Sequence, residues 1–124
     1  MEKTKDLLAE VLGISEHVRY VAVYDSDNLS IRQRSDIQNV SSNESDKYEE
    51  LLVNPTLIKL ASQRGNIDCG GLEYFIIRYG NFFVLLTPCK SGHVNIGVEP
   101  DQDPFLLIEP LNALLGKYGL DLNR

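Results

Sequence analysis

The sequence predicts an α+β fold, in which helices cover both faces of a five-stranded antiparallel sheet. Five segments show the apolar–polar alternation or the enrichment in Val, Ile, Tyr and Phe that is typical of strands, and three have apolar residues at helical spacing. Short turns join the last three strands, which favours an antiparallel meander. The predicted element order is α-β-β-α-β-β-β-α, in a single domain over residues 1–124.

A helix and a hairpin are expected first. Residues 3–12 have an apolar helical face and end at Gly13. Residues 18–24 are rich in strand-forming residues, and residues 29–34 alternate apolar and polar. Residues 25–28 are short and polar, so they predict the turn that joins the two strands.

The middle of the chain leaves two alternatives open. Residues 35–45 are polar, and we expect a mobile connection; a helix over residues 46–64 follows. Pro55 interrupts this helix, because proline lacks an amide donor and clashes with the preceding turn. Asn54 before it is also typical of an N-cap. One kinked helix and two short helices that meet at Asn54 both agree with this pattern.

Three strands and a helix complete the chain. Residues 72–79 and 82–87 are the strongest predicted strands, joined by a Gly80-Asn81 turn, and residues 93–98 are the fifth strand.

The last helix begins with Asp103 as cap and Pro104 at the first position. Pro110 is expected to kink it, and Gly116 or Gly119 to end it. The expected inner face of the helix consists of Phe105, Ile108, Leu111, Leu114 and Leu115.

The simplest compact arrangement places the strands in the spatial order 2-1-5-4-3. This order leaves residues 72–79 at an edge of the sheet, where only Glu73 and Arg78 would oppose pairing. Pairing with a second copy would satisfy this edge and form a two-fold dimer. The alternatives are that a loop covers the edge or that the strand order differs.

We therefore expect a dimer or partner interface at this edge and on the neighbouring helix. The predicted interface residues are Leu72, Tyr74, Ile76 and Arg78 on the strand, and Tyr48, Leu51, Leu52 and Ile58 on the helix.

Three passages resemble a known family. VRYVAVYD (residues 18–25) with its turn, YFIIRYGNFFVLL (residues 74–86), and residues 93–98 with the following acidic turn and helix resemble the roadblock/LC7 family, within the profilin-like and PAS-like group. The resemblance extends over about residues 3–118. It implies a homodimeric scaffold or regulator, commonly linked to small Ras-like GTPases or to motor complexes. Pro55 and the long loop over residues 35–45 depart from the family pattern.

Signatures of catalysis and metal binding are missing from the sequence, so we expect no enzyme, no cofactor and no metal site. There is no GxSxG and no phosphate-binding GxxxxGK[ST] motif. His17 and His93 are far apart, and Cys69 and Cys89 lack CxxC spacing. The close pair Cys89 and His93 spans a turn and a strand start.

The net charge of -6 argues against nucleic acid as a partner, because an acidic chain repels phosphates. No apolar run approaches the roughly 20 residues that span a bilayer, and the N-terminus lacks the apolar centre of a signal peptide. We expect a cytoplasmic, non-enzymatic interaction module that binds itself and a protein partner such as a small Ras-like GTPase. The alternative function is a PAS-like domain that senses a small ligand.

Overall fold

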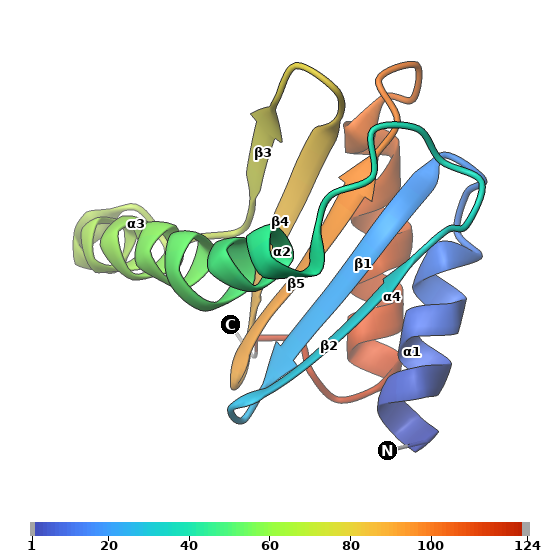
Figure 1. Cartoon of the computed structure of the whole chain (residues 1–124). Coiled ribbons are helices and arrows are strands. Elements are labelled where there is room, and N and C mark those ends of the chain that lie inside the picture. The colour runs from blue at the N-terminus through green and yellow to red at the C-terminus, as the bar shows by residue number, and fades with distance from the viewer. Residues whose placement is uncertain (1, 123–124) are drawn as a thin grey trace.

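The computed structural model describes residues 2–122 and contains one antiparallel sheet in the order β2-β1-β5-β4-β3 (Figure 1). The predicted fold class and strand order are confirmed. The strands are β1 (Val18–Asp25), β2 (Asn28–Gln33), β3 (Phe75–Arg78), β4 (Phe83–Cys89) and β5 (Gly92–Val98).

The centre of the sheet joins the two halves of the chain. β1 pairs with β5, with Val21 opposite Ile96 and Val23 opposite Val94. Because side chains alternate along a strand, these residues share one face, and Tyr20 and Asn95 belong to the other. At the centre of the sheet, the first face is apolar and the second carries polar groups.

Helices cover both faces of the sheet. Figure 1 shows α1 (Glu2–Leu12) and α4 (Ile108–Lys117) side by side on one face, and α2 (Asn43–Tyr48) on the other. α2 continues through a π-helical turn, η1 (Glu49–Val53), into α3 (Asn54–Asp68). α3 extends beyond β3 and away from the sheet (Figure 1).

The π turn resolves the alternatives left open at Pro55. The Asn54 amide donates to the Glu49 carbonyl, five residues earlier, as in a π-helix. Pro55 has no amide to donate, and the wider π turn directly before it accommodates the missing hydrogen bond at the start of α3. The helix is therefore one continuous run that widens by a residue before the proline.

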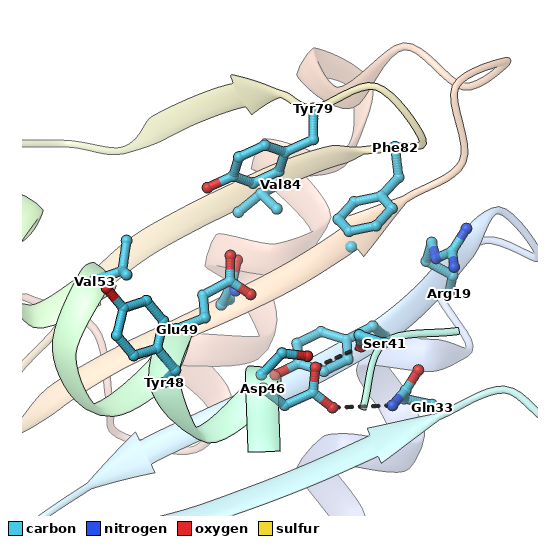
Figure 2. Close-up of a pocket in the computed structure, with 14 residues that line it drawn as sticks. Arg19, Gln33, Ser41, Asp46, Tyr48, Glu49, Val53, Tyr79, Phe82 and Val84 are labelled. Atoms are coloured by element: carbon cyan, nitrogen blue, oxygen red, sulfur yellow. Dashed lines mark hydrogen bonds between the residues drawn. The ribbon is translucent and has the colours of Figure 1, made fainter. Parts of the chain in front are cut away.

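The connection before α2 is tied to the sheet. α2 begins at Asn43, earlier than predicted, because the Ser42 side chain accepts a hydrogen bond from the Ser45 amide. The Asp46 carboxylate accepts from Ser41 Oγ, and from Gln33 Nε2 at 3.1 Å (Figure 2). From β1, Arg19 donates to the backbone carbonyls of Gln38 and Asn39 at 2.7 and 3.0 Å.

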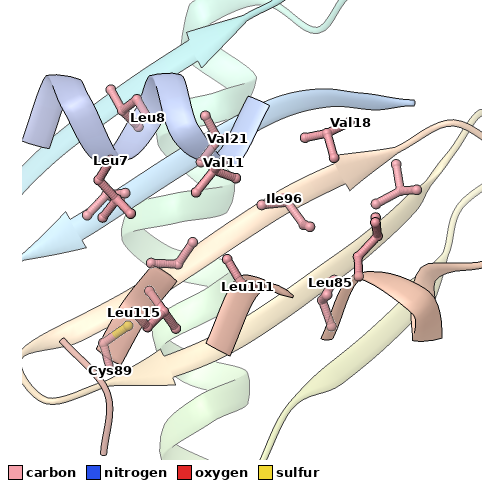
Figure 3. Close-up of a cluster of buried hydrophobic side chains, with 14 residues drawn as sticks. Leu7, Leu8, Val11, Val18, Val21, Leu85, Cys89, Ile96, Leu111 and Leu115 are labelled. Carbon is pink, nitrogen blue, oxygen red and sulfur yellow. The ribbon is translucent and has the colours of Figure 1, made fainter. Parts of the chain in front are cut away.

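The hydrophobic core lies between the sheet and the α1–α4 layer (Figure 3). Its fully buried members include Leu7, Val11, Leu85, Ile96, Leu111 and Leu115. Burying each such side chain contributes about 1.5–3 kcal/mol before conformational entropy is counted. The core thus fixes α1 and α4, and α3 has no comparable anchor.

Two sequence expectations are corrected. β3 spans only Phe75–Arg78, because in this register Glu73 would face Pro88, which has no amide to donate. Phe105 was expected on the inner face of the last helix, but it is 61% exposed. A 3-10 turn, η2 (Pro104–Leu107), precedes α4 and turns Leu107 inward instead.

α4 itself continues past Pro110. Pro110 lies in the first turn, where its missing amide costs no intrahelical hydrogen bond.

Candidate partner interface

β3 is an edge strand. It pairs with β4 through Phe75–Leu86, Ile76–Leu85, Ile77–Val84 and Arg78–Phe83, and no other described strand pairs with it. Its outer side therefore presents backbone groups that another strand could pair with. The structure thus places β3 at the edge of the sheet, as predicted.

The side chains of β3 divide between the two faces of the sheet. Ile76 packs against the core beside Phe83, so it does not face solvent at the edge. The Arg78 guanidinium lies over the Phe83 ring, 5.0 Å from its centroid. Ile77 lies on the opposite face, so of the two isoleucines only Ile77 faces the α3 side.

Leu72 and Tyr74 precede the strand. Leu72 is half-buried, and Tyr74 is 36% exposed. The Tyr74 ring meets Phe105 edge to face, with 6.5 Å between centroids. Tyr74 thus faces η2 and is separated from the helical part of the predicted interface.

The helix that leaves the sheet exposes large apolar side chains. Tyr48 is 63% exposed, Leu52 53%, Leu60 62% and Ile67 76%. Because the π turn absorbs one extra residue, Leu60 and Ile67 lie about three and about five turns beyond Tyr48, on the same side of the helix. We call Tyr48, Leu52, Leu60 and Ile67 the apolar stripe.

Two further predicted residues lie on this helix. Leu51 is 51% exposed and flanks the stripe. Ile58 is half-buried. The structure therefore brings Tyr48, Leu51 and Leu52 together at a solvent-exposed surface, and it adds Leu60 and Ile67, which the sequence analysis did not select.

The inner side of the same helix is held by a buried carboxylate. Glu50, on η1, is fully buried and accepts four hydrogen bonds. They come from Tyr20 Oη (2.7 Å), His93 Nε2 (2.7 Å), Asn95 Nδ2 (2.8 Å) and Asn54 Nδ2 (2.9 Å). Since a carboxylate only accepts, His93 carries a proton on Nε2.

These hydrogen bonds determine the charge state of Glu50. Burial alone would raise its pKa, but the hydrogen bonds from His93, Asn95 and Tyr20 outweigh burial and lower the pKa below its ordinary value. Glu50 is therefore ionised at neutral pH. It anchors η1 to β1 and β5 from the polar face of the sheet.

The sequence analysis missed this cluster. A usable signal was present in the fifth strand, where His93 and Asn95 alternate with Val94 and Ile96. Polar residues on one face of an interior strand require a polar partner on the covering helix. Glu50 and Asn54, one helical turn apart, are the candidates that this rule would have found.

Other candidate chemistry in the sequence is not assembled. Cys69 is exposed and Cys89 is buried, and both thiols are free. Cys89 packs in the core, where burial raises its pKa to about 12, and His93 faces Glu50 on the other side of the sheet. Over residues 2–122, no cluster of His, Cys, Asp and Glu is placed to hold a metal ion.

Comparison with known proteins identifies the fold. No family model matches the sequence, and no curated protein sequence matches it. Among solved structures, a roadblock/LC7 domain from Streptomyces avermitilis superposes with a TM-score of 0.69 at 10% identity, covering 90% of each chain. This chain has a roadblock/LC7-like fold.

Other structures agree with this roadblock-like fold. The gliding protein MglB from Thermus thermophilus has a TM-score of 0.64 at 10% identity, over 94% of this chain and 88% of that one. MglC from Myxococcus xanthus has a TM-score of 0.60 at 11% identity, over 94% and 96%. Another similar structure is of MglB in a tetrameric arrangement, with a TM-score of 0.62 at 9% identity, over 94% of this chain and 90% of that one.

None of the helices within residues 2–122 is both long enough and apolar enough to cross a membrane.

Proposed function

We propose that this chain is a non-enzymatic interaction module that forms a homodimer through the β3 edge and the apolar stripe. The observation that carries the proposal is the exposure of Tyr48, Leu52, Leu60 and Ile67 on a helix that extends away from the sheet. A row of exposed apolar side chains of this length is typical of a protein interface.

A second copy is the partner that best fits both features. In a two-fold dimer, the edge strand and the adjacent helix of one copy contact the same strand and helix of the other copy. One interface would therefore bury both the β3 edge and the apolar stripe. A strand added at β3 would also extend the sheet by main-chain hydrogen bonds.

The dimer is tested by sedimentation velocity of the full chain. The variant Leu52→Glu/Leu60→Glu places two charges in the stripe, and we expect it to be monomeric at a concentration where the unmodified chain is dimeric. The matched control is Leu106→Glu, on η2, whose leucine is 66% exposed. It should leave the dimer intact. A stable dimer would be well populated at about 10 µM. If the unmodified chain is monomeric at this concentration, the proposal is refuted.

We further propose that the dimer recruits a small Ras-like GTPase in the cytoplasm, as roadblock-type regulators do. The support is the roadblock-like fold together with the resemblance in the three strand passages. A pull-down with the tagged chain tests the recruitment. The small GTPases are taken from the organism that encodes the chain, and each is loaded with a non-hydrolysable GTP analogue or with GDP. No retention in either nucleotide state would refute it, and a fluorescent fusion tests the location.

A further inference from the structure

A cavity of ≈280 Å³ lies between the polar face of the sheet and the α2–η1 helix. Figure 2 shows Tyr79 and Phe82 on the β3–β4 side, Tyr48 and Glu49 on the helix, and Asp46 near the start of α2. Its volume lies just under the roughly 300–1,000 Å³ of sites for drug-sized ligands. A ligand here would be small, with about ten non-hydrogen atoms.

Asn95 is one of the residues that line this cavity, and its buried side-chain oxygen has no hydrogen-bond partner in the described part of the chain. The residue is fully buried, and its Nδ2 donates to Glu50 Oε2 at 2.8 Å. Because a carboxylate cannot donate, the amide cannot be flipped, and Oδ1 is turned away from Glu50. No donor within the described part of the chain reaches Asn95 Oδ1. Buried acceptors without a partner are rare and require an explanation.

Two carboxylates line the same cavity without a balancing cation. Asp46 and Glu49 form no ion pair with any residue in the range 2–122. Burial, and then the charges of Glu50 and Asp46, raise the pKa of Glu49 to about 7. The one guanidinium at the cavity, on Arg19, is already paired with Glu99 at 2.7 Å. The cavity thus offers acceptors and negative charge.

The remaining walls of the cavity are aromatic and could contact the apolar part of an organic cation. Tyr48, Tyr79 and Phe82 present aromatic rings, whose faces attract ammonium and guanidinium groups. The Arg19 guanidinium already covers one face of the Phe82 ring, 4.7 Å from its centroid, so the rings of Tyr48 and Tyr79 are the main aromatic walls for a ligand. The aromatic and acidic groups therefore select for the same kind of ligand.

We propose that this cavity binds a small organic ammonium ion, held by the carboxylates of Asp46 and Glu49, with Asn95 Oδ1 accepting an N–H and the aromatic rings enclosing its apolar body. Every group that forms the site belongs to one chain, and Tyr48 is the residue that the site shares with the apolar stripe. Binding would make this module a sensor of an amine as well as an interaction domain.

Titration of the full chain with tyramine and with 4-ethylphenol tests the proposal. The two probes share a ring and an ethyl group, and only tyramine carries an ammonium ion. We expect saturable calorimetric binding of tyramine, and binding of 4-ethylphenol that is at least about tenfold weaker. Amide chemical shifts should change around Phe82, Glu49 and Asn95.

Variants that remove charges distinguish binding of tyramine in this cavity from non-specific attraction of a cation to an acidic protein. Asp46→Asn/Glu49→Gln should weaken tyramine binding by about tenfold or more. The control Asp36→Asn/Glu44→Gln removes two charges at exposed positions and should change binding less than about twofold. Circular dichroism confirms that both variants fold.

Three results would overturn the proposal: no binding of tyramine up to about 10 mM, equal affinity for the two probes, or shift changes confined to the acidic segment over residues 99–103. The homodimer is tested separately by sedimentation velocity, so failure of this proposal and failure of the homodimer can be distinguished.

Discussion

Glu50 is the residue on which the polar side of this fold depends. One carboxylate accepts hydrogen bonds from β1, from β5 and from the start of α3, so it joins three elements that are far apart in the sequence. A buried charge is tolerated only when its hydrogen bonds are complete. The π turn places Glu50 in position to receive all four of them.

Replacing Glu50 with Gln should destabilise the protein. An amide offers one acceptor oxygen and brings its own donors, so at least two of the four donors lose their partner. We expect the free energy of unfolding to fall by about 2–4 kcal/mol, measured by urea denaturation. Glu44→Gln, exposed on α2, is the control and should change the free energy by less than about 0.5 kcal/mol. Equal stability of the two variants would show that Glu50 is not an anchor.

Glu49 and Glu50 should give opposite pH dependences of stability. The folded-state pKa of Glu49 is raised from 4.5 to about 7, so the folded chain binds the extra proton between these values, and stability falls as pH rises through this window. The folded-state pKa of Glu50 is lowered from 4.5, so its contribution is complete above about pH 4.5 and is lost as pH falls below it.

The variant Glu49→Gln should therefore be more stable than the unmodified chain at pH 8, by about 1–2 kcal/mol after solvent screening is allowed for. The stability of this variant should decrease much less between pH 5 and 8, because the Glu49 carboxyl that titrates in this range is gone. Burial also raises the pKa of Asp46, so this group contributes a pH dependence of the same sign. Urea midpoints at four pH values measure the effect, and an unchanged slope would show that Glu49 is not its source.

At the scale of elements, the β4–β5 turn is held against the end of β1. A Cβ added at Gly92 would lie 1.8 Å from the Tyr24 carbonyl oxygen, far inside any contact distance. The backbone of β1 would have to move, and β1 pairs with both β2 and β5.

We expect Gly92→Ala to destabilise the fold by about 2–4 kcal/mol, because backbone atoms leave no flexible group to yield. Gly80→Ala, in the β3–β4 turn, is the control, since a Cβ there meets nothing within 4 Å. Thermal unfolding followed by circular dichroism compares the two variants. Similar melting temperatures would mean that the β4–β5 turn can shift away from Tyr24.

At the scale of the whole molecule, charge should oppose the proposed dimer. Each copy carries a net charge of -6, so two copies repel one another at low ionic strength. Salt screens this repulsion and leaves the apolar contact intact. We expect the dimer dissociation constant to decrease by about threefold or more between 50 and 500 mM NaCl, measured by sedimentation equilibrium. A dimer that weakens with salt would indicate an interface built on ion pairs.

The elements and their order in the sheet could be predicted from the amino-acid sequence. Local periodicity identifies strands and helices, and the short turns around Gly80-Asn81 and before His93 leave few ways to order five strands. The edge position of β3 followed from that order. The elements depend on neighbours in the sequence, and the short turns leave few compact orders for the strands, so one sequence is enough to predict both.

The contacts between side chains of distant elements could not be predicted from the sequence and became visible in the folded chain. Local spacing placed Phe105 inward, but a 3-10 turn directed it to solvent. Spacing also did not reveal that Glu50 would collect donors from Tyr20, His93 and Asn95, or that a π turn would align Tyr48 with Leu60 and Ile67. The physical reason is that burial of a charge and the register of a helix are settled by packing between elements, which no local pattern encodes.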